Sequence, residues 1–440
     1  MILIRVIVAI VFVHLLFLAT TAKARCTDPI GRLAAIQGQA EVRRSGETAW
    51  ETASREDTFC PGDLLRLGPG GRAAVVLENE TVLRLDQNTT VTFGSPDHGR
   101  SLLNLVRGAL HIFSHRPRAL QVITPYVNGT VEGTEFLVTT DDRQSRITVF
   151  SGLVIALNQH GLLNVTDGQS VLARHGSPPF YETVIRPQDA VGWTLYYPAI
   201  LSDSATSQKG EPAQWVRQAA AALAIGRATQ AREACAAALA ATPDDSRALA
   251  LLSILELTQN NRQIAAELAR QAWDARPRSA AAGLALSYAR QAAFDIVGAR
   301  AILLETAAVA PDDPLVLARL AELQLASGSH DDAVATAHKA LQLAPDHGLA
   351  RVVLGFVHLA RVEIEQAEQA FNEAIARDQL LPLARLGLGL ARIRSGAVAE
   401  GRAAIELAAA LDPGSSLLRS YLGKAYYEER HNDNAQRQFL

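Results

Sequence analysis

Histidine and cysteine are the residues of this sequence whose chemistry could support a metal site or catalysis. His111 and His115 lie four residues apart, in a segment whose β-branched and apolar residues predict a strand. On a strand that spacing only places two side chains on one face, whereas a chelating pair four residues apart requires a helix. The sequence contains neither a His-Glu-x-x-His nor a Cys-x-x-Cys motif. It therefore predicts no metal site, no cofactor and no catalytic residue.

Two glycine-rich stretches could also be read as ligand loops. The run GPGGRAAV, residues 68–75, lacks the Lys-Ser or Lys-Thr pair of a phosphate loop, so its glycines predict a turn between strands. In residues 122–142, VITPYVNGTVEGTEFLVTTDD, Asn128-Gly129 predicts a turn and Gly133 a β-bulge. Glu132 and Glu135 stand beside them without an evident catalytic partner. The glycines of both stretches are therefore explained by backbone geometry, and neither stretch predicts a catalytic site.

Cys26 and Cys60 are candidates for a disulfide. An oxidising compartment would let them pair, and the closed loop of about 35 residues would stabilise the fold by roughly 3 to 4 kcal/mol. Spacing alone does not prove a pairing, so two unrelated thiols remain the alternative. Cys235 lies in the alanine-rich run AREACAAALA and is expected to be a small buried core residue.

The first 24 residues resemble a secretory signal. Arg5 is followed by an apolar run over residues 6–19, and Ala22-Lys23-Ala24 forms a small-x-small site that would release a chain beginning at Arg25. The run is shorter than the roughly 20 residues that a spanning helix needs. We expect a cleaved signal; the alternative is an uncleaved segment that anchors the chain in a membrane.

Composition changes along the 440 residues and predicts two domains of different class. The first part is rich in Val, Thr and Gly, and the part after residue 212 is dominated by Ala and Leu. The net charge of −3 provides no basic face for nucleic acid. We expect an all-β domain over residues 25–176, a linker over 177–211 and an all-α domain over 212–440. The linker segment VGWTLYYPAIL is expected to pack on a domain, with a partner-docking strip as the alternative.

A 34-residue period organises the second half. Prolines recur at this interval, with Gln379 at one skipped position: Pro243, Pro277, Pro311, Pro345 and Pro413. Twelve residues before each position of the series stands a small residue: Ala231, Ala265, Ala299, Ala333, Ala367 and Gly401. Small residues let two helices cross closely, and proline ends each unit. The pattern resembles the tetratricopeptide repeat (TPR), over six units and a seventh that stops inside its second helix.

This resemblance implies a curved solenoid that holds a protein or peptide partner in its concave face. The residues that we place on that face in units four and five are apolar: Val352, Phe356, Leu359, Leu386, Leu390 and Ile393. They form the candidate partner groove. The alternative is that they only pack neighbouring helices together.

The β region resembles the FecR domain of bacterial envelope proteins. The matching stretches are GRLAAIQGQAEVRR followed by Trp50, then PGDLLRLGPGGRAAVVLENETVLRL, and then VITPYVNGTVEGTEFLV with ITVFSGLVIAL. Short strands at roughly ten-residue spacing predict a sandwich or β-roll, and residues 73–77 and 81–85 a hairpin. The resemblance implies an exported module that binds an envelope protein or a glycan. In its best-known members a FecR protein relays a signal across the inner membrane to a sigma factor. Because no N-terminal helical domain precedes the apolar run of this sequence, we do not expect direct control of a sigma factor here.

Together these features predict a non-enzymatic, exported binding or scaffold protein of the bacterial periplasm. Its FecR-like β domain would be joined to a TPR array that mediates protein-protein interactions. The first alternative is an inner-membrane-anchored regulator of envelope signalling that faces the periplasm. The second is a cell-envelope enzyme whose site the sequence does not reveal.

Overall fold

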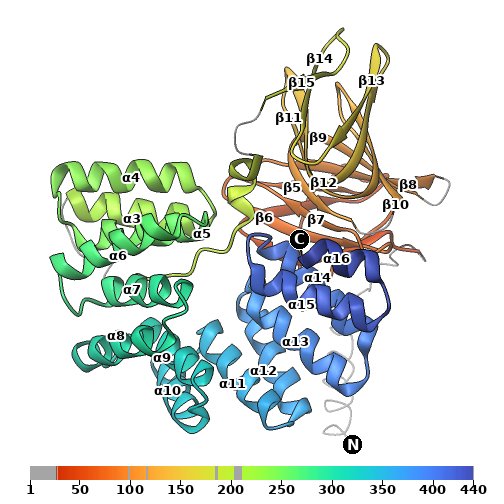
Figure 1. The fold of residues 1–440 in the computed structure, drawn as a ribbon. Helices are drawn as coiled ribbons and strands as arrows, with labels where there is room; N and C mark the ends of the chain where they lie inside the picture. Colours follow the sequence, from red (N-terminus) through yellow and green to blue (C-terminus); the bar gives the residue numbers. More distant parts are fainter. Residues whose placement is uncertain are drawn as a thin grey trace, which may run out of the picture.

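The computed structural model describes residues 26, 28–97, 100–114, 117–183, 187–202 and 211–439. An all-β domain is followed by a short 3-10 helix, η1 (Pro187–Thr194), and then by helices α3 to α16 (Figure 1). The predicted order, an all-β domain and then an all-α solenoid, is confirmed. The expected signal segment, residues 1–24, lies outside the described residues. No helix within the described ranges combines the length and the apolar character that crossing a membrane requires.

The β domain is one hydrogen-bonded network of fifteen strands among the described residues. They are β1 (Gly31–Gln37), β2 (Ala40–Arg43), β3 (Glu51–Thr52), β4 (Thr58–Phe59), β5 (Leu64–Leu67), β6 (Arg72–Leu77), β7 (Val82–Leu85), β8 (Thr90–Asp97), β9 (Arg100–Phe113), β10 (Pro117–Ile123), β11 (Asn128–Thr140), β12 (Gln144–Asn158), β13 (Gly161–Thr166), β14 (Ser170–Arg174) and β15 (Phe180–Glu182). Their buried faces enclose a core in which the rings of Phe59 and Phe93 stack at 4.2 Å.

Long strands that change partners join the parts of this network. The first half of β9 pairs with β8 and β10, and its second half pairs with β7 and β11. At the change stands Gly108, with a φ of 103°. A side chain there would meet Thr89, so this position favours glycine. The strand can therefore turn from one pair of partners to the other without steric conflict.

The three short-range β predictions have different outcomes. The predicted hairpin is confirmed, because β6 and β7 pair antiparallel with Ala73 opposite Leu85. The bulge near Gly133 is also confirmed by a register shift between Glu132 and Glu135. The turn at Asn128-Gly129 is wrong: Gly129 pairs with Ala156 inside β11. A methyl group at Gly129 would lie 3.2 Å from Ile147 Cδ1, so packing and not a turn explains this glycine.

Fourteen helices follow in the described part, arranged as seven pairs. They are α3 (Glu211–Ala224), α4 (Ala228–Ala241), α5 (Ser246–Thr258), α6 (Arg262–Ala275), α7 (Ala280–Ala292), α8 (Ile296–Val309), α9 (Pro314–Ala326), α10 (His330–Leu343), α11 (Gly348–Ala360), α12 (Ile364–Arg377), α13 (Pro382–Ser395), α14 (Val398–Leu411), α15 (Ser416–Glu428) and α16 (Asn432–Phe439). Each pair is one repeat, so α3 with α4 is repeat one and α15 with α16 is repeat seven.

The small residues that recur every 34 positions lie where the two helices of a repeat cross. All six positions of the column that ends at Gly401 are buried. In repeat six, a methyl group on Gly389 would lie 2.7 Å from the carbonyl oxygen of Gly401. In repeat two, Ser253 Oγ donates to the carbonyl oxygen of Ala265 at 2.8 Å. Close approach of the two backbones therefore accounts for the small side chains.

The repeats also share an N-cap position, and one repeat departs from it. The caps are Asp245, Ser279, Asp313, His347, Leu381 and Ser415, each 34 residues from the next. Five of these side chains accept a backbone N–H of the helix that follows. The aliphatic side chain of Leu381 cannot accept a hydrogen bond. Two residues earlier, Gln379 stands where the other repeats have proline. Repeat six thus breaks the pattern twice within one turn.

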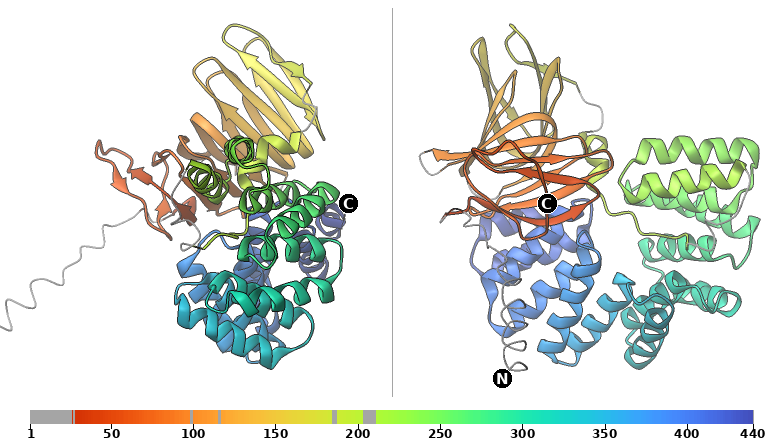
Figure 2. Two further views of the ribbon diagram at one scale, coloured as in Figure 1. Left: turned by 90° about the vertical axis from the view of Figure 1, so that its left-hand side faces the viewer. Right: turned by 180° about the vertical axis from the view of Figure 1, so that it is seen from behind.

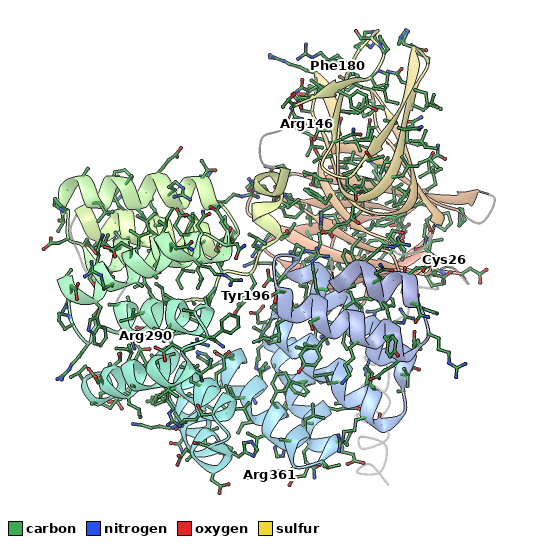
Figure 3. All side chains as sticks on the ribbon, viewed as in Figure 1. Cys26, Arg146, Phe180, Tyr196, Arg290 and Arg361 are labelled. Carbon is green, nitrogen blue, oxygen red and sulfur yellow. A yellow bond between two sulfur atoms is a disulfide. The ribbon has the colours of Figure 1, made fainter. Side chains whose placement is uncertain are left out.

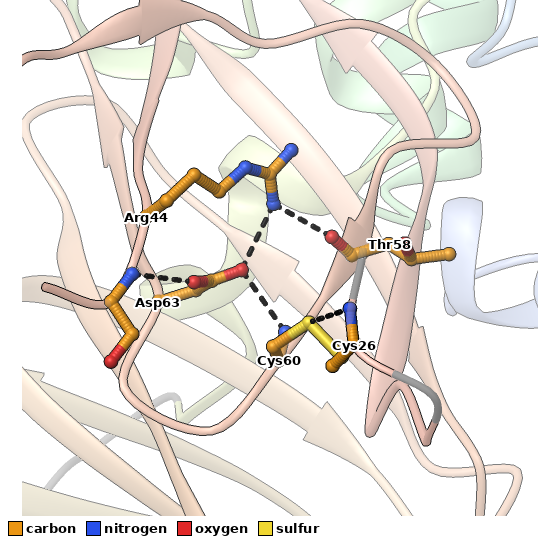
Figure 4. The surroundings of a disulfide bond; sticks show 6 residues. Cys26, Arg44, Thr58, Cys60 and Asp63 are labelled. Carbon is orange, nitrogen blue, oxygen red and sulfur yellow. Dashed lines mark hydrogen bonds and ion pairs between the residues drawn. A yellow bond between two sulfur atoms is a disulfide. The ribbon is translucent and has the colours of Figure 1, made fainter. Parts of the chain in front are cut away.

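The predicted disulfide is present near the start of the β domain (Figure 4). Cys26 and Cys60 are joined with their Cα atoms 6.0 Å apart. The adjacent turn is held by Asp63, whose carboxylate accepts from Cys60 N at 3.0 Å and from Arg44 Nη1 at 2.9 Å. Cys235 is buried, and burial raises the pKa of its thiol to about 12. A protonated thiol in the core is a poor nucleophile, in agreement with the expected packing role.

Candidate functional site

The β domain is docked on the last repeats of the solenoid. Figures 1 and 2 show α14 and α16 directly beneath the strands, with the first repeats standing to one side. Residues Ile405 to Leu411 of α14 are buried without a break, which is typical of a helix that is covered on all sides. Ala74 and Val82 of the sheet belong to the same apolar cluster as this helix. Docking therefore removes one face of the solenoid from solvent.

The turn that breaks the repeat pattern is part of this docking surface. Gln379 Oε1 accepts a hydrogen bond from the backbone N–H of Ile36 at 3.0 Å. Arg385 Nη2, one turn into α13, donates to the carbonyl oxygen of Ala34 at 2.7 Å. Strand β1 has a register shift between Leu33 and Ala35, which leaves backbone groups there available to other partners. The presence of Gln379 in place of proline is thus explained by its hydrogen bond to strand β1.

Two buried arginines connect the β sheet to the first and the sixth repeats of the solenoid. Arg84 on β7 donates to the carbonyl oxygen of Ala410 at 2.6 Å, at the end of α14. Arg72 on β6 donates to the carbonyl oxygen of Ala224 at 2.8 Å, at the end of α3. The last carbonyls of a helix carry partial negative charge, so a guanidinium is well placed there. Burial lowers the pKa of Arg84 to about 9.

A third arginine forms a network of ion pairs at the docked helix. Arg402 on α14 contacts Glu406 and Glu429 at 2.5 Å, and Glu80 in the β6–β7 turn at 3.0 Å. Tyr426 donates to Glu406 at 2.5 Å. Burial raises the pKa of Glu406 to about 7, although Arg402 and Tyr426 act in the opposite direction. The network joins repeats six and seven to the β domain through one guanidinium.

Glu135 has two partners that lie far from it in sequence. Its Oε1 lies 3.2 Å from His111 Nε2 on β9, and its Oε2 accepts from Arg419 Nη2 of α15 at 2.7 Å. Burial alone would raise the pKa of Glu135, but His111 and Arg419 outweigh it and lower the pKa to about 2. Glu135 is therefore a fixed anion that joins the β domain to repeat seven. Nothing in the local sequence could indicate this, because Arg419 is 284 residues away.

The linker crosses the interior of the molecule; we call residues 191–201 the strap. Trp193 packs against Leu137 of the β domain, whereas Tyr197 and Ile200 belong to the core of repeats one to four. Tyr196 packs against repeats five and six (Figure 3). Its backbone N–H donates to the carboxylate of Asp412. The strap therefore contacts the β domain and both halves of the solenoid.

The six predicted groove residues differ in how deeply they are buried and in what they contact. Val352 and Leu386 are buried, and Leu386 lies in the cluster that packs on the β domain. Phe356 is half-buried, with its ring edge-on to Phe371 at 5.0 Å. The remaining three, Leu359, Leu390 and Ile393, line a cavity of about 320 Å³ between repeats five and seven.

We call this cavity the apolar groove. Ile405, Tyr421 and Ala425 complete its apolar walls, and Arg394, Lys424 and Glu428 provide charge around them. Tyr421 and Lys424 also line a second hollow along α15, beside the exposed side chains of Leu417 and Tyr427. The two hollows together present apolar surface on the last repeats that the β domain does not cover.

The described residues contain no cluster of three or more His, Cys, Asp or Glu side chains that could hold a metal ion. Two strongly shifted acids, Glu135 and Glu406, are held in ion pairs with arginine, and a third, Asp412, whose pKa burial raises to about 6, accepts the backbone N–H of Tyr196. Such pairs stabilise a fold by fixing both charges, and they also perturb pKa values without any catalytic role. The pKa shifts of Glu135 and Glu406 therefore have a structural explanation in their ion pairs.

Comparison with known proteins agrees with the two-part organisation. A family model for the FecR protein matches residues 63–155, and one for the tetratricopeptide repeat matches residues 324–388. No curated protein matches this chain.

Several solved structures are similar to parts of the chain. The Cut9-Hcn1 hetero-tetramer of the APC/C is 18% identical, with a TM-score of 0.45, covering 56% of this chain and 48% of that one. Pseudomonas aeruginosa pilF is 19% identical, with a TM-score of 0.34, covering 44% of this chain and 89% of that one. A putative anti-sigma factor from Parabacteroides distasonis is 17% identical, with a TM-score of 0.28, covering 30% and 66%. This chain thus spans about half the length of the Cut9-Hcn1 chain. By its sequence matches and its fold, the protein combines a FecR domain with C-terminal tetratricopeptide repeats.

Proposed function

We propose that this protein is a non-enzymatic, exported binding protein of the bacterial periplasm. Its solenoid takes an apolar segment of a partner protein in the apolar groove, and its docked β domain holds the solenoid in one shape. The observation that carries this proposal is the groove itself. It leaves Leu390, Ile393 and Tyr421 half-buried in the wall of a cavity, on repeats that pack against the β domain elsewhere.

The charges of the groove favour one kind of partner. Arg394 and Lys424 stand at the apolar walls against a single acid, Glu428. A segment with acidic residues beside its apolar ones would therefore match the groove in both shape and charge. An amphipathic helix or an extended strand segment could supply this pattern.

The first test of the groove is the substitution Leu390→Asp. An aspartate would place a charge on the apolar wall, so we expect partner binding to fall by roughly tenfold or more. The measurement is photo-crosslinking in cells from a probe at Tyr421, which lines the groove. Phe356 is not a suitable target, because its contact with Phe371 makes a loss of stability difficult to separate from a loss of binding.

The matched control is Leu304→Asp, on the exposed surface of α8 and outside the groove. A crosslinked partner that is retained by Leu304→Asp and lost by Leu390→Asp would support the groove. A partner that crosslinks equally to both variants would eliminate it. Circular dichroism of each purified variant ensures that a lost crosslink does not arise from unfolding.

Export is supported by the disulfide and by the N-terminal apolar run of the sequence. We expect the mature chain to begin at Arg25 and to be released with soluble periplasmic proteins on osmotic shock. The measurement is fractionation followed by N-terminal sequencing. A chain that retains residues 1–24 and sediments with the inner membrane would instead support the anchored signalling regulator.

The tip of the β domain offers a second surface for an envelope protein or a glycan. Phe180 and Tyr181 of β15 are exposed, and so is Leu162 on β13. Tyr181 OH donates to the carbonyl oxygen of Asn164 on β13 at 2.7 Å, which fixes the position of its side chain. Exposed aromatic rings held in fixed positions are typical of recognition surfaces.

A further inference from the structure

Helix α8 has an apolar outer surface that stays exposed in the described part of the chain. Val297, Ala301, Leu304 and Ala308 are all exposed on it, and Val297 and Leu304 are 74% and 50% exposed. Their spacing of four, three and four residues places them in one row along the helix; we call this row the α8 stripe. Figures 1 and 2 show α8 at the outer side of the solenoid, away from the β domain.

The second helices of other repeats differ from α8 at these four positions. One series is covered: in α14 it ends at Ala410, which is buried in the cluster that contains Ala74 and Val82 of the β domain. Two exposed series are mostly polar, with Gln263, Glu267, Arg270 and Asp274 in α6, and Glu365, Gln369, Asn372 and Ala376 in α12. An apolar series on α8 therefore indicates that this surface, like that of α14, has a cover.

The residue just before α8 gives a second, independent sign of a contact. Phe294 is 86% exposed and has a φ of 65°. A bulky residue adopts this left-handed conformation at an energetic cost. Three of the other repeats have glycine at the equivalent position: Gly226, Gly328 and Gly396. An exposed ring where glycine would be less strained is expected when the ring has a contact to make.

The charges around the α8 stripe do not select a charged partner. The stripe itself contains no charged residue. Asp295 is paired with Arg290 at 3.3 Å, and Glu305 with Arg278 at 4.0 Å. Arg300, the remaining charge of α8, donates to the N-cap serine of α10 at 3.3 Å. Two identical surfaces of this kind can therefore meet with their charges already engaged within each chain.

Two-fold symmetry adds a match of shape. A two-fold axis through the middle of the stripe, between Ala301 and Leu304, places two α8 helices antiparallel. Val297 then lies opposite Ala308 of the second copy, and Ala301 lies opposite Leu304 of the second copy. Each large side chain meets a small one, and each contact occurs twice. This alternation lets the two helices approach closely along a coiled-coil seam.

We propose that the α8 stripe is the two-fold interface of a homodimer, in which it packs antiparallel against the α8 stripe of a second copy of this chain. Two helices of 14 residues bury less than the roughly 800 Å² per partner of a standard interface, so the dimer is weak and reversible. The interface lies on repeat three and the apolar groove lies between repeats five and seven, so either proposal can fail alone.

The first test is sedimentation velocity of the purified protein over a range of concentrations. We expect a reversible monomer–dimer equilibrium with a dissociation constant of roughly 1–100 µM. A wild type that stays monomeric at about 500 µM would overturn the dimer. Binding of a monomer to phosphatidylcholine vesicles that Leu304→Asp abolishes would assign the stripe to a membrane and would also overturn it.

Single substitutions then locate the interface. Leu304→Asp should weaken self-association at least roughly hundredfold, because each copy would place a carboxylate in the apolar seam. The matched control is Leu417→Asp on α15, since Leu417 is 51% exposed and Leu304 is 50% exposed. The control should dimerise like the wild type. A Leu304→Asp variant that also dimerises like the wild type would exclude the stripe as the interface.

Mixing two variants tests the antiparallel register. Ala301→Arg alone should be monomeric, because two arginines would enter the seam. Mixed with Leu304→Asp, it should form a heterodimer: one arginine faces one aspartate, and the other Ala301–Leu304 contact is that of the wild type. Two monomeric variants that stay monomeric when mixed would contradict this register. A Leu304→Asp variant that is monomeric but keeps its groove crosslink would show that the two surfaces act separately.

Discussion

Replacing Arg402 by alanine is expected to destabilise the protein by about 3–5 kcal/mol at neutral pH. The guanidinium has three carboxylate partners, and Glu406 is 3% exposed, so its removal leaves an acid buried without its cation. The loss is measured by urea unfolding followed by circular dichroism. Hydrogen exchange should also show faster exchange of α14 and of the β6–β7 turn that contains Glu80, because Arg402 joins them.

The pH dependence of the destabilisation distinguishes the loss of the ion pair from a simple loss of packing. A carboxyl group whose pKa is raised in the folded state stabilises the fold fully below its unfolded pKa, near 4.5, and loses that contribution as pH rises through about 7. Without Arg402 the pKa of Glu406 rises further, so the destabilisation should be larger at pH 8 than at pH 5. The double variant Arg402→Met with Glu406→Leu should recover much of the loss. A destabilisation that is the same at both pH values would show that the ion pair is not its cause.

Removing the disulfide should have a similarly large effect. The bridge closes a loop with a sequence separation of 34, for which chain entropy predicts roughly 4 kcal/mol of stabilisation. Cys26→Ser with Cys60→Ser should therefore lower the unfolding midpoint in urea, and the reduced wild type should match this variant. Asp63 still holds the turn around Cys60, so the native fold should persist in the variant at low denaturant.

Cys235→Ser is the control for reagents that act on thiols, because this third cysteine is buried and unpaired with another cysteine. Alkylation of intact cells before lysis should leave Cys26 and Cys60 unmodified if the chain has been exported and oxidised. Full modification of both thiols would contradict the proposed periplasmic location. An unfolding midpoint of the variant equal to that of the wild type would contradict the stabilising role.

Periodicity predicted the solenoid well because each repeat depends on close contacts within itself. The small residues at Ala231, Ala265 and their equivalents report helix crossings, and every position of that column is buried. Composition and short-range pairing likewise predicted the β domain and the β6–β7 hairpin. The turn at Asn128-Gly129 failed because a pair that favours turns was overridden by pairing within the sheet, where Gly129 is needed for side-chain packing.

The groove residues show why it is harder to predict which surface of a solenoid stays free than to predict its repeats. Periodicity placed all six residues on one face of the solenoid, but it carried no information on what covers that face. Leu386 is buried in the cluster that also contains Ala74 and Val82 of the β domain, and Val352 packs in the cluster of repeats five and six, whereas Leu359, Leu390 and Ile393 line the cavity. A signal was present in Gln379 and Leu381, since a repeat that loses both its proline and its polar cap indicates a contact that the others lack.

The two arginines on neighbouring strands also affect how the molecule comes apart. An isolated solenoid unravels from its ends, because each terminal repeat has only one neighbour. Here Arg72 holds the end of α3 and Arg84 holds the end of α14, 326 residues from its partner carbonyl. Arg84 thus holds repeat six, and the ion pair between Glu135 and Arg419 holds repeat seven, so neither end is free to fray while the sheet is intact. The array is therefore expected to unfold together with the β domain in one cooperative transition.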